Sequence, residues 1–213
     1  IIKTKPSNFN SLILNKVNSG SLTTNLELYF KENLILENFI ARGNVKKMKA
    51  NIFKNFNLQN TQFNFFFDNT YVLIKDIQSD VNGIILNEGS LKIKKDQNIT
   101  IESDFITKLN INKNNINGYL QLFKNFKFFN KETILDTKLN HNLTVTLDST
   151  YKVVDYTYSN RGNIKYFSNK LNKKIESEFL NDDLEILSLK DSEINFNNSF
   201  KQKHNLVLKG KYS

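Results

Sequence analysis

Two histidines and one acidic cluster are the side chains whose types could support catalysis or metal binding. His141 and His204 each alternate with strand-like residues, and the chain has no cysteine to pair with either of them. An isolated histidine in a strand is more often a half-buried or surface side chain than a ligand. Asp182 and Asp183 with Glu185 could hold Ca²⁺, but they lack the spacing of an EF-hand loop, so a solvated turn is the simpler interpretation.

Carboxylates and glycines elsewhere in the chain do not form a catalytic pattern. Asp76, Asp80 and Glu88 are scattered through expected turns, so nothing in the sequence fixes a pair of carboxylates for acid–base chemistry. No glycine-rich segment resembles a phosphate-binding loop. We therefore predict that the chain is not an enzyme and that it binds no cofactor and no metal ion.

The basic charge of the chain raises the question of nucleic-acid binding. The formal net charge is +9, but Arg42 and Arg161 are the only arginines, and proteins that read nucleic acids depend on arginine for bidentate contacts. Lysines and aromatic residues interleave in 120–129 and 151–166, as in a base-stacking platform. The phenylalanines share their parity with leucine and isoleucine, however, which marks an apolar face. We predict no nucleic-acid partner, and lysines on a solvated or membrane-facing surface.

Helical periodicity is confined to the beginning of the chain. Ser7 precedes apolar residues spaced three to four apart, which predicts a short helix over residues 7–18 that ends before Gly20. A weaker helical pattern covers residues 33–41. No apolar run approaches the ~18 residues of a membrane span. Because the sequence opens on Ile1 and closes inside a strand-like pattern, we expect it to be an excerpt of a longer protein.

From residue 21 to residue 211 the hydrophobic period is two, which is typical of strands with one buried face. Turn residues separate the alternating runs, among them Asp68-Asn69, Glu88-Gly89 and the segment 160–162. This alternation predicts an antiparallel meander of many strands rather than a βαβ fold. The apolar sets that share a parity are Leu22, Leu26, Leu28 and Phe30; Ile99, Ile101 and Phe105; and Leu135, Leu139, Leu143, Val145 and Leu147.

The segment 62–76 is predicted to form a β-hairpin with an aromatic face. Phe63, Phe65 and Phe67 alternate with their neighbours, Asp68-Asn69 interrupts the run, and a β-branched run follows. One short helix cannot cover a sheet of this size. The apolar face therefore needs either a second sheet, as in a sandwich or barrel, or an apolar ligand.

The register of this hairpin depends on the length of its turn. A two-residue turn at Asp68-Asn69 would place Phe65 opposite Val72, whereas a three-residue loop would place it opposite Leu73. The phenylalanines share one face with either turn.

A five-residue pattern occurs twice in the chain and contains both arginines. RGNVK at 42–46 returns as RGNIK at 161–165. Two interpretations remain open: a coincidence in a sequence of low diversity, or a repeated strand start in an array of units that stack along one axis.

The order of elements resembles a known family. The run PSNFNSLILNKVNSGSLTTNLELYF, a short helical pattern that ends in Asn-Ser-Gly and enters a strand, is similar to the AsmA-like proteins, most of all to their YhdP branch, which is related to TamB. The patterns I-x-S-D-V-N-G-x-x-L-x-x-G-x-L-x-I and I-T-I-E-S-D-F continue this similarity. It covers Pro6 to about Asn112, and beyond that only the style of alternating strands is shared. The chain departs from the family in its few glycines and its single proline.

The resemblance implies an all-β fold: an elongated, twisted antiparallel sheet that forms a groove, with a short N-terminal helix. It divides the chain into a helix and lead-in at 1–20, an AsmA/YhdP-like β region at 21–112 and a continuing strand region at 113–213. It also implies a periplasmic protein of Gram-negative bacteria, anchored to the inner membrane by a segment outside this chain. Its partners would be phospholipid acyl chains that pass toward the outer membrane. The residues expected to line the lipid groove are Leu26, Leu28, Phe63, Phe65, Val72, Ile74, Ile99, Ile101 and Phe105.

A function of another class remains open. The chain could be a structural or adhesin-like β-sandwich or filament module with a closed core and no lipid ligand. A closed sandwich requires two inward faces of matched volume, whereas a groove requires one apolar face along every strand.

Overall fold

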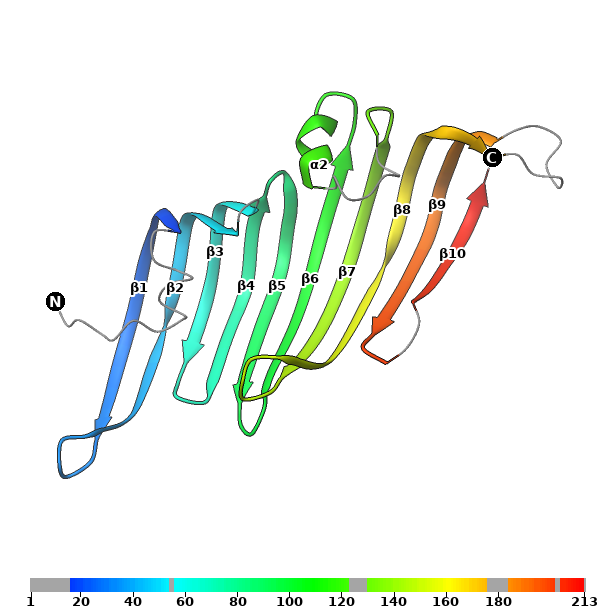
Figure 1. The fold of residues 1–213 in the computed structure, drawn as a ribbon. Helices are drawn as coiled ribbons and strands as arrows, with labels where there is room; N and C mark the ends of the chain where they lie inside the picture. The colour runs from blue at the N-terminus through cyan, green and yellow to red at the C-terminus, as the bar shows by residue number, and fades with distance from the viewer. Residues whose placement is uncertain (1–15, 54–55, 123–129, 176–183, 202–203, 213) are drawn as a thin grey trace.

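The chain forms one open sheet of ten antiparallel strands in the part that the structure, a computed structural model, describes (Figure 1). The described residues are 16–53, 56–122, 130–175, 184–201 and 204–212. One short helix, α2 (Ile116–Leu122), stands between the sixth and seventh strands. The strands are β1 (Val17–Phe30), β2 (Leu36–Phe53), β3 (Phe56–Phe67), β4 (Tyr71–Val81), β5 (Ile84–Lys95), β6 (Ile99–Ile111), β7 (Ile134–Leu147), β8 (Val153–Ile175), β9 (Leu184–Ser199) and β10 (Asn205–Tyr212).

The order of the strands in the sheet is the order in the sequence. Each strand therefore pairs with its neighbours along the chain, and β1 and β10 are the two edges. Figure 1 shows the strands side by side, with β1 and β10 at opposite ends of the sheet. The predicted all-β antiparallel meander is confirmed.

The first predicted helix does not reach Asn18. Val17 and Asn18 belong to β1, where Val17 lies opposite Ala50, while residues 7–15 lie outside the described part of the chain. Gly20, expected to end the helix, is inside the strand, where a Cβ would come within 3.0 Å of Met48 Cα. Pairing with β2 satisfies the backbone groups of these residues and overrides the local helical spacing.

The second predicted helix, over residues 33–41, is wrong. Residues from Leu36 onward belong to β2, and a tight loop joins this strand to β1. In the loop the Lys31 amide donates to the Ile35 carbonyl at 2.9 Å, and Leu34 has a positive φ of 61°. The apolar residues that suggested a helix lie in a long strand because a complete partner strand is available to them.

Helix α2 was not predicted, because helical periodicity in the sequence is confined to the beginning of the chain. Asn112 opens it: its carboxamide accepts a hydrogen bond from the Asn114 amide at 3.0 Å, and its own amide donates to the Asn115 side chain at 2.8 Å. Ile116 and Tyr119 then pack on the strands. Asparagine and glycine have low helix propensity, so tertiary packing holds this helix.

The aromatic hairpin has a turn one residue later than predicted. The Asp68 amide donates to the Tyr71 carbonyl at 2.9 Å, so the central turn residues are Asn69 and Thr70. The Asp68 carboxylate accepts from the Thr70 amide at 2.8 Å and from the Tyr71 amide at 2.7 Å, and these bonds, first that of Thr70, lower its pKa. Phe65 consequently lies opposite Ile74. The shift relative to the predicted register is two residues, which preserves the face on which each side chain lies.

Two other predicted turns are strand interiors. Glu88-Gly89 lies at a register irregularity in β5, and residues 160–162 lie in the middle of β8. At Gly162 a Cβ would come 2.1 Å from the Lys138 carbonyl oxygen. Glycine at this position permits a close approach of two strands and does not mark a turn.

The two copies of the repeated pattern are also strand interiors and not strand starts. Arg42 lies in β2 and Arg161 in β8, each in the second strand of a hairpin. Gly43 is opposite Thr24 of β1, and Gly162 is opposite Leu139 of β7. The pattern therefore recurs at equivalent places in the hairpins β1–β2 and β7–β8.

Candidate functional site

All nine residues predicted to line a groove lie on one side of the sheet, which we call the apolar face. Residues that are directly opposite in neighbouring strands project to the same side. One register row crosses eight strands in this way and includes three of the predicted residues. From β1 to β8 this row contains Leu26, Ala41, Phe67, Val72, Ile93, Ile101, Val145 and Tyr156.

The other predicted lining residues follow from the same registers. Leu28 shares the parity of Leu26, and Phe63 and Phe65 share that of Phe67, while Ile74 is opposite Phe65. On β6, Ile99 and Phe105 alternate with Ile101. The hydrophobic period of two places these residues on one side of each strand. The registers between the strands then place them on the same side of the sheet.

Exposure differs strongly along the apolar face. Leu26 on the edge strand β1 is 55% exposed, whereas Phe65 is 9% exposed. The Phe65 ring stacks on Phe67 with a centroid distance of 4.8 Å and meets the edge of Phe63 at 6.5 Å. Large neighbouring side chains therefore shield the interior of the face, while its ends are open to water.

Helix α2 covers the apolar face at one end of β5–β7. Ile116 and Tyr119 of the helix form the buried cluster with Leu109 and Ile111 of β6. The Tyr119 hydroxyl donates to the Gly83 carbonyl at 2.6 Å, which ties the helix to the β4–β5 turn. This end of the face is an ordinary protein core.

A polar network interrupts the apolar face at β6–β8. His141 Nε2 lies 2.7 Å from Thr107 Oγ1, and His141 Nδ1 lies 2.8 Å from the Tyr158 hydroxyl and 3.0 Å from Asn160 Nδ2. A proton on Nε2 lets His141 donate to Thr107 and accept from the other two groups. Burial lowers the pKa of His141, so the ring is neutral near pH 7.

Asn160 completes this network but leaves one oxygen unpaired. It is 8% exposed, and its Oδ1 has no hydrogen-bond partner among the described residues. A buried polar atom without a partner costs about 1–3 kcal/mol. The sequence singled out His141 but not its partners Thr107, Tyr158 and Asn160, because these are spaced as ordinary strand residues.

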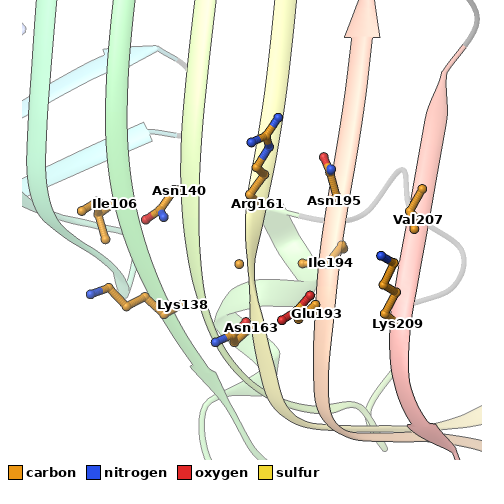
Figure 2. A pocket seen from close by; sticks show the side chains of 11 residues that line it. Ile106, Lys138, Asn140, Arg161, Asn163, Glu193, Ile194, Asn195, Val207 and Lys209 are labelled. Atoms are coloured by element: carbon orange, nitrogen blue, oxygen red, sulfur yellow. The ribbon is translucent and has the colours of Figure 1, made fainter.

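The opposite side of the sheet, which we call the polar face, is charged and contains a hollow of about 680 Å³ across β6–β10 (Figure 2). Sequence reasoning did not predict this hollow, although it singled out the pattern that contains Arg161. The residues that line it are Ile106, Lys138, Asn140, Arg161, Gly162, Asn163, Glu193, Ile194, Asn195, Val207 and Lys209.

Ion pairs lie on the same face outside this hollow. Arg42 pairs with Glu27 across β1 and β2, and the Lys92 ammonium lies 2.9 Å from the Glu102 carboxylate across β5 and β6. The Tyr29 hydroxyl and then Arg42 lower the pKa of Glu27. Salt bridges at such exposed positions fix side-chain directions more than they stabilise the fold.

The structure describes only some of the residues considered for metal binding. Among the described residues no three histidine, cysteine, aspartate or glutamate side chains form a cluster that could hold a metal ion. Asp182 and Asp183 lie outside the described part, and His204 stacks on Phe196 at a centroid distance of 6.1 Å. No helix in the described ranges is long and apolar enough to cross a membrane.

No protein-family model, no curated protein and no solved structure matches this chain.

Proposed function

We propose that this chain is a non-enzymatic segment of a periplasmic lipid conduit of the AsmA/YhdP type, in which phospholipid acyl chains move along the apolar face. The observation that carries the proposal is the row that begins at Leu26 and continues through eight strands to Tyr156. At a strand spacing of about 4.8 Å, such a row is roughly 34 Å long. That length is comparable to the ~30 Å hydrocarbon thickness of a bilayer, which two acyl chains fill.

The attraction between this face and an acyl chain is non-directional. Each methylene that leaves water contributes about 0.8 kcal/mol, wherever along the face it lies. An exposed apolar surface of this kind is expected at a binding site. Leu26 and Leu28 at one edge and Leu206 and Leu208 at the other are about half exposed, so acyl chains could reach the face from either end.

The polar network around His141 is compatible with sliding acyl chains. Its hydrogen bonds are satisfied within the network, except at Asn160 Oδ1, and that atom is buried. A passing methylene therefore meets few polar groups that need water. The proposal requires no cofactor, metal ion or nucleic acid. In this proposal the membrane anchor lies outside this chain, and the polar face with its lysines stays in water.

A photo-crosslinking amino acid at Leu26 tests the proposal, with the same amino acid at Asn25 as the matched control. These two neighbours lie on opposite faces of one strand. After incubation with phospholipid vesicles, irradiation should give lipid adducts at Leu26, detected by mass spectrometry, and several-fold fewer at Asn25. Equal yields at the two positions, or none at Leu26, would contradict the proposal.

The thermal melt of Leu26→Asp completes this experiment. Leu26 is half exposed, so a carboxylate there should leave the fold intact while it reduces adducts with a crosslinker at Leu28. Phe65 is less suitable for this test, because its side chain is 9% exposed and a charge there would be buried.

A structural module is the second candidate, and the burial around α2 favours it. Ile111 is 1% exposed beneath the helix, which is the packing of a closed core. If the whole apolar face were covered by protein in the same way, Leu26→Asp would lower the melting temperature strongly and no lipid adduct would form.

A further inference from the structure

The two arginines occupy equivalent places in two hairpins but differ in their partners. Arg42 is opposite Asn25, and Arg161 is opposite Asn140. Glu27 lies two residues beyond Asn25 on β1 and pairs with Arg42. The corresponding residue on β7, two beyond Asn140, is uncharged.

That uncharged residue is Asn142, whose carboxamide donates to the Asp104 carboxylate of β6. Arg161 consequently has no carboxylate partner among the described residues. An exposed guanidinium with five donors and no anion beside it is available to a ligand.

Amide side chains flank Arg161 on both sides. Asn140 of β7 and Asn195 of β9 are its direct register partners. Asn195 Oδ1 accepts a hydrogen bond from Asn197 Nδ2 at 3.1 Å, which leaves the Asn195 amide hydrogens without a partner in the described part of the chain. Three donor groups in a row therefore line the hollow of the polar face, as Figure 2 shows.

The charge of the hollow favours an anion. Lys138 and Lys209 line it together with Arg161, against one carboxylate, that of Glu193. Glu193 is opposite Lys209 in the register, and in Figure 2 the Arg161 side chain extends away from it. The Arg161 row of the hollow, with Asn140 and Asn195 as register partners, therefore has one positive charge and no carboxylate.

We propose that this hollow binds a phosphate group, free or ester-linked, with Arg161 as the main ligand. The planar guanidinium can donate two parallel hydrogen bonds to two phosphate oxygens, and the amides of Asn140 and Asn195 donate to the others. Lys138 and Lys209 add positive potential. This site is on the opposite side of the sheet from the apolar face and does not depend on the proposed lipid conduit.

Titration calorimetry with inorganic phosphate at low ionic strength tests the site. Saturable binding is expected, and Arg161→Gln should weaken it about tenfold or more, since charge-assisted hydrogen bonds are lost. Arg42→Gln is the matched control, because it removes the same charge from the equivalent strand position. The affinity of Arg42→Gln for phosphate should differ less than twofold from that of the original chain. Absence of saturable binding, or equal losses in both variants, would overturn the proposal.

Asn195→Asp provides a second variant that keeps Arg161. Aspartate has the size of asparagine and can still accept from Asn197, but it brings a carboxylate beside the guanidinium. The Asn195→Asp variant should lose phosphate binding, and its melting temperature should not be lower than that of the original chain. Unchanged binding in Asn195→Asp would contradict the assigned site.

Glycerol phosphate distinguishes the sources of the phosphate. If glycerol phosphate binds more tightly than inorganic phosphate, and Arg161→Gln loses the binding of both equally, the ligand is an ester-linked phosphate such as a lipid headgroup. Tighter binding of inorganic phosphate assigns the free ion. If Arg161→Gln bound both glycerol phosphate and inorganic phosphate as well as the original chain does, the proposal would be overturned.

Discussion

His141 is held in the apolar face by polar neighbours, and none of its hydrogen-bond partners is charged. Thr107, Tyr158 and Asn160 surround the imidazole, and burial alone lowers its pKa. The unfolded chain has a histidine pKa of about 6.5. Below that pH the unfolded state therefore takes up a proton that the folded state resists.

We expect the stability to fall as the pH decreases from about 6.5, and this loss to end below the lowered pKa of the folded state. The slope contributed by one histidine is at most about 1.4 kcal/mol per pH unit. Melting temperatures between about pH 5 and pH 7.5 should show this fall in the original chain and a smaller one in His141→Gln. His204→Gln, at an exposed position, is the control and should keep the full pH dependence. A pH dependence that is the same in all three proteins would contradict this role of His141.

At the scale of elements, the close approach of neighbouring strands explains two of the glycines. A Cβ at Gly43 would lie 2.0 Å from the Thr23 carbonyl oxygen, and one at Gly162 would lie 2.1 Å from that of Lys138. Backbone cannot move aside as a flexible side chain can. Both hairpins therefore depend on glycine at the same place of the repeated pattern.

Gly43→Ala should destabilise the chain by about 1–3 kcal/mol, the usual cost of inserting a methyl group into a packed site. Gly118→Ala is the control, because nothing lies within 4 Å of a Cβ there and alanine favours the helix by up to about 1 kcal/mol. Urea unfolding should thus show a lower midpoint for Gly43→Ala and an unchanged or higher one for Gly118→Ala. Equal midpoints for Gly43→Ala and the original chain would show that the strands can separate at no cost.

At the scale of the molecule, the sheet is nearly one-dimensional. Each strand pairs with its sequence neighbours, and within the described residues β1 and β10 have a neighbour on one side only. In such an array stability is the sum of local terms and nearest-neighbour contacts. The ends of the sheet should open more easily than its middle.

Amide hydrogen exchange is expected to be slowest in β6–β8 and fastest in β1 and β10. The middle strands have partners on both sides, and α2 packs on the end of β6. Exchange followed by mass spectrometry on peptides of each strand measures this gradient. Protection of β1 or β10 equal to that of β7 would contradict it and would indicate that the edge is paired.

Local periodicity determined much of this fold. Leu22, Leu26 and Leu28 face one side of β1, and Ile99, Ile101 and Phe105 face one side of β6, as the alternation predicts. The reason is physical: successive residues of a strand point to opposite sides, so parity within a strand needs no knowledge of its partners. The common face of the nine predicted lining residues follows from this together with the registers.

Register, bulges and non-local packing were decided only by the tertiary structure. Lys47, Asn60, Asp76 and Asp191 have positive φ angles within strands, and no glycine marks these places in the sequence. Helix α2 forms where apolar strands offer it a surface, against its own propensity.

The two polar groupings of the sheet depend on such long-range pairing. His141 meets Asn160, and Arg161 lies between Asn140 and Asn195, only because β7, β8 and β9 pair in one register. A slip of one residue would exchange the faces of these side chains. The sequence by itself therefore determined which side chains of each strand lie together, and the pairing energy of whole strands decided which of them meet across the sheet.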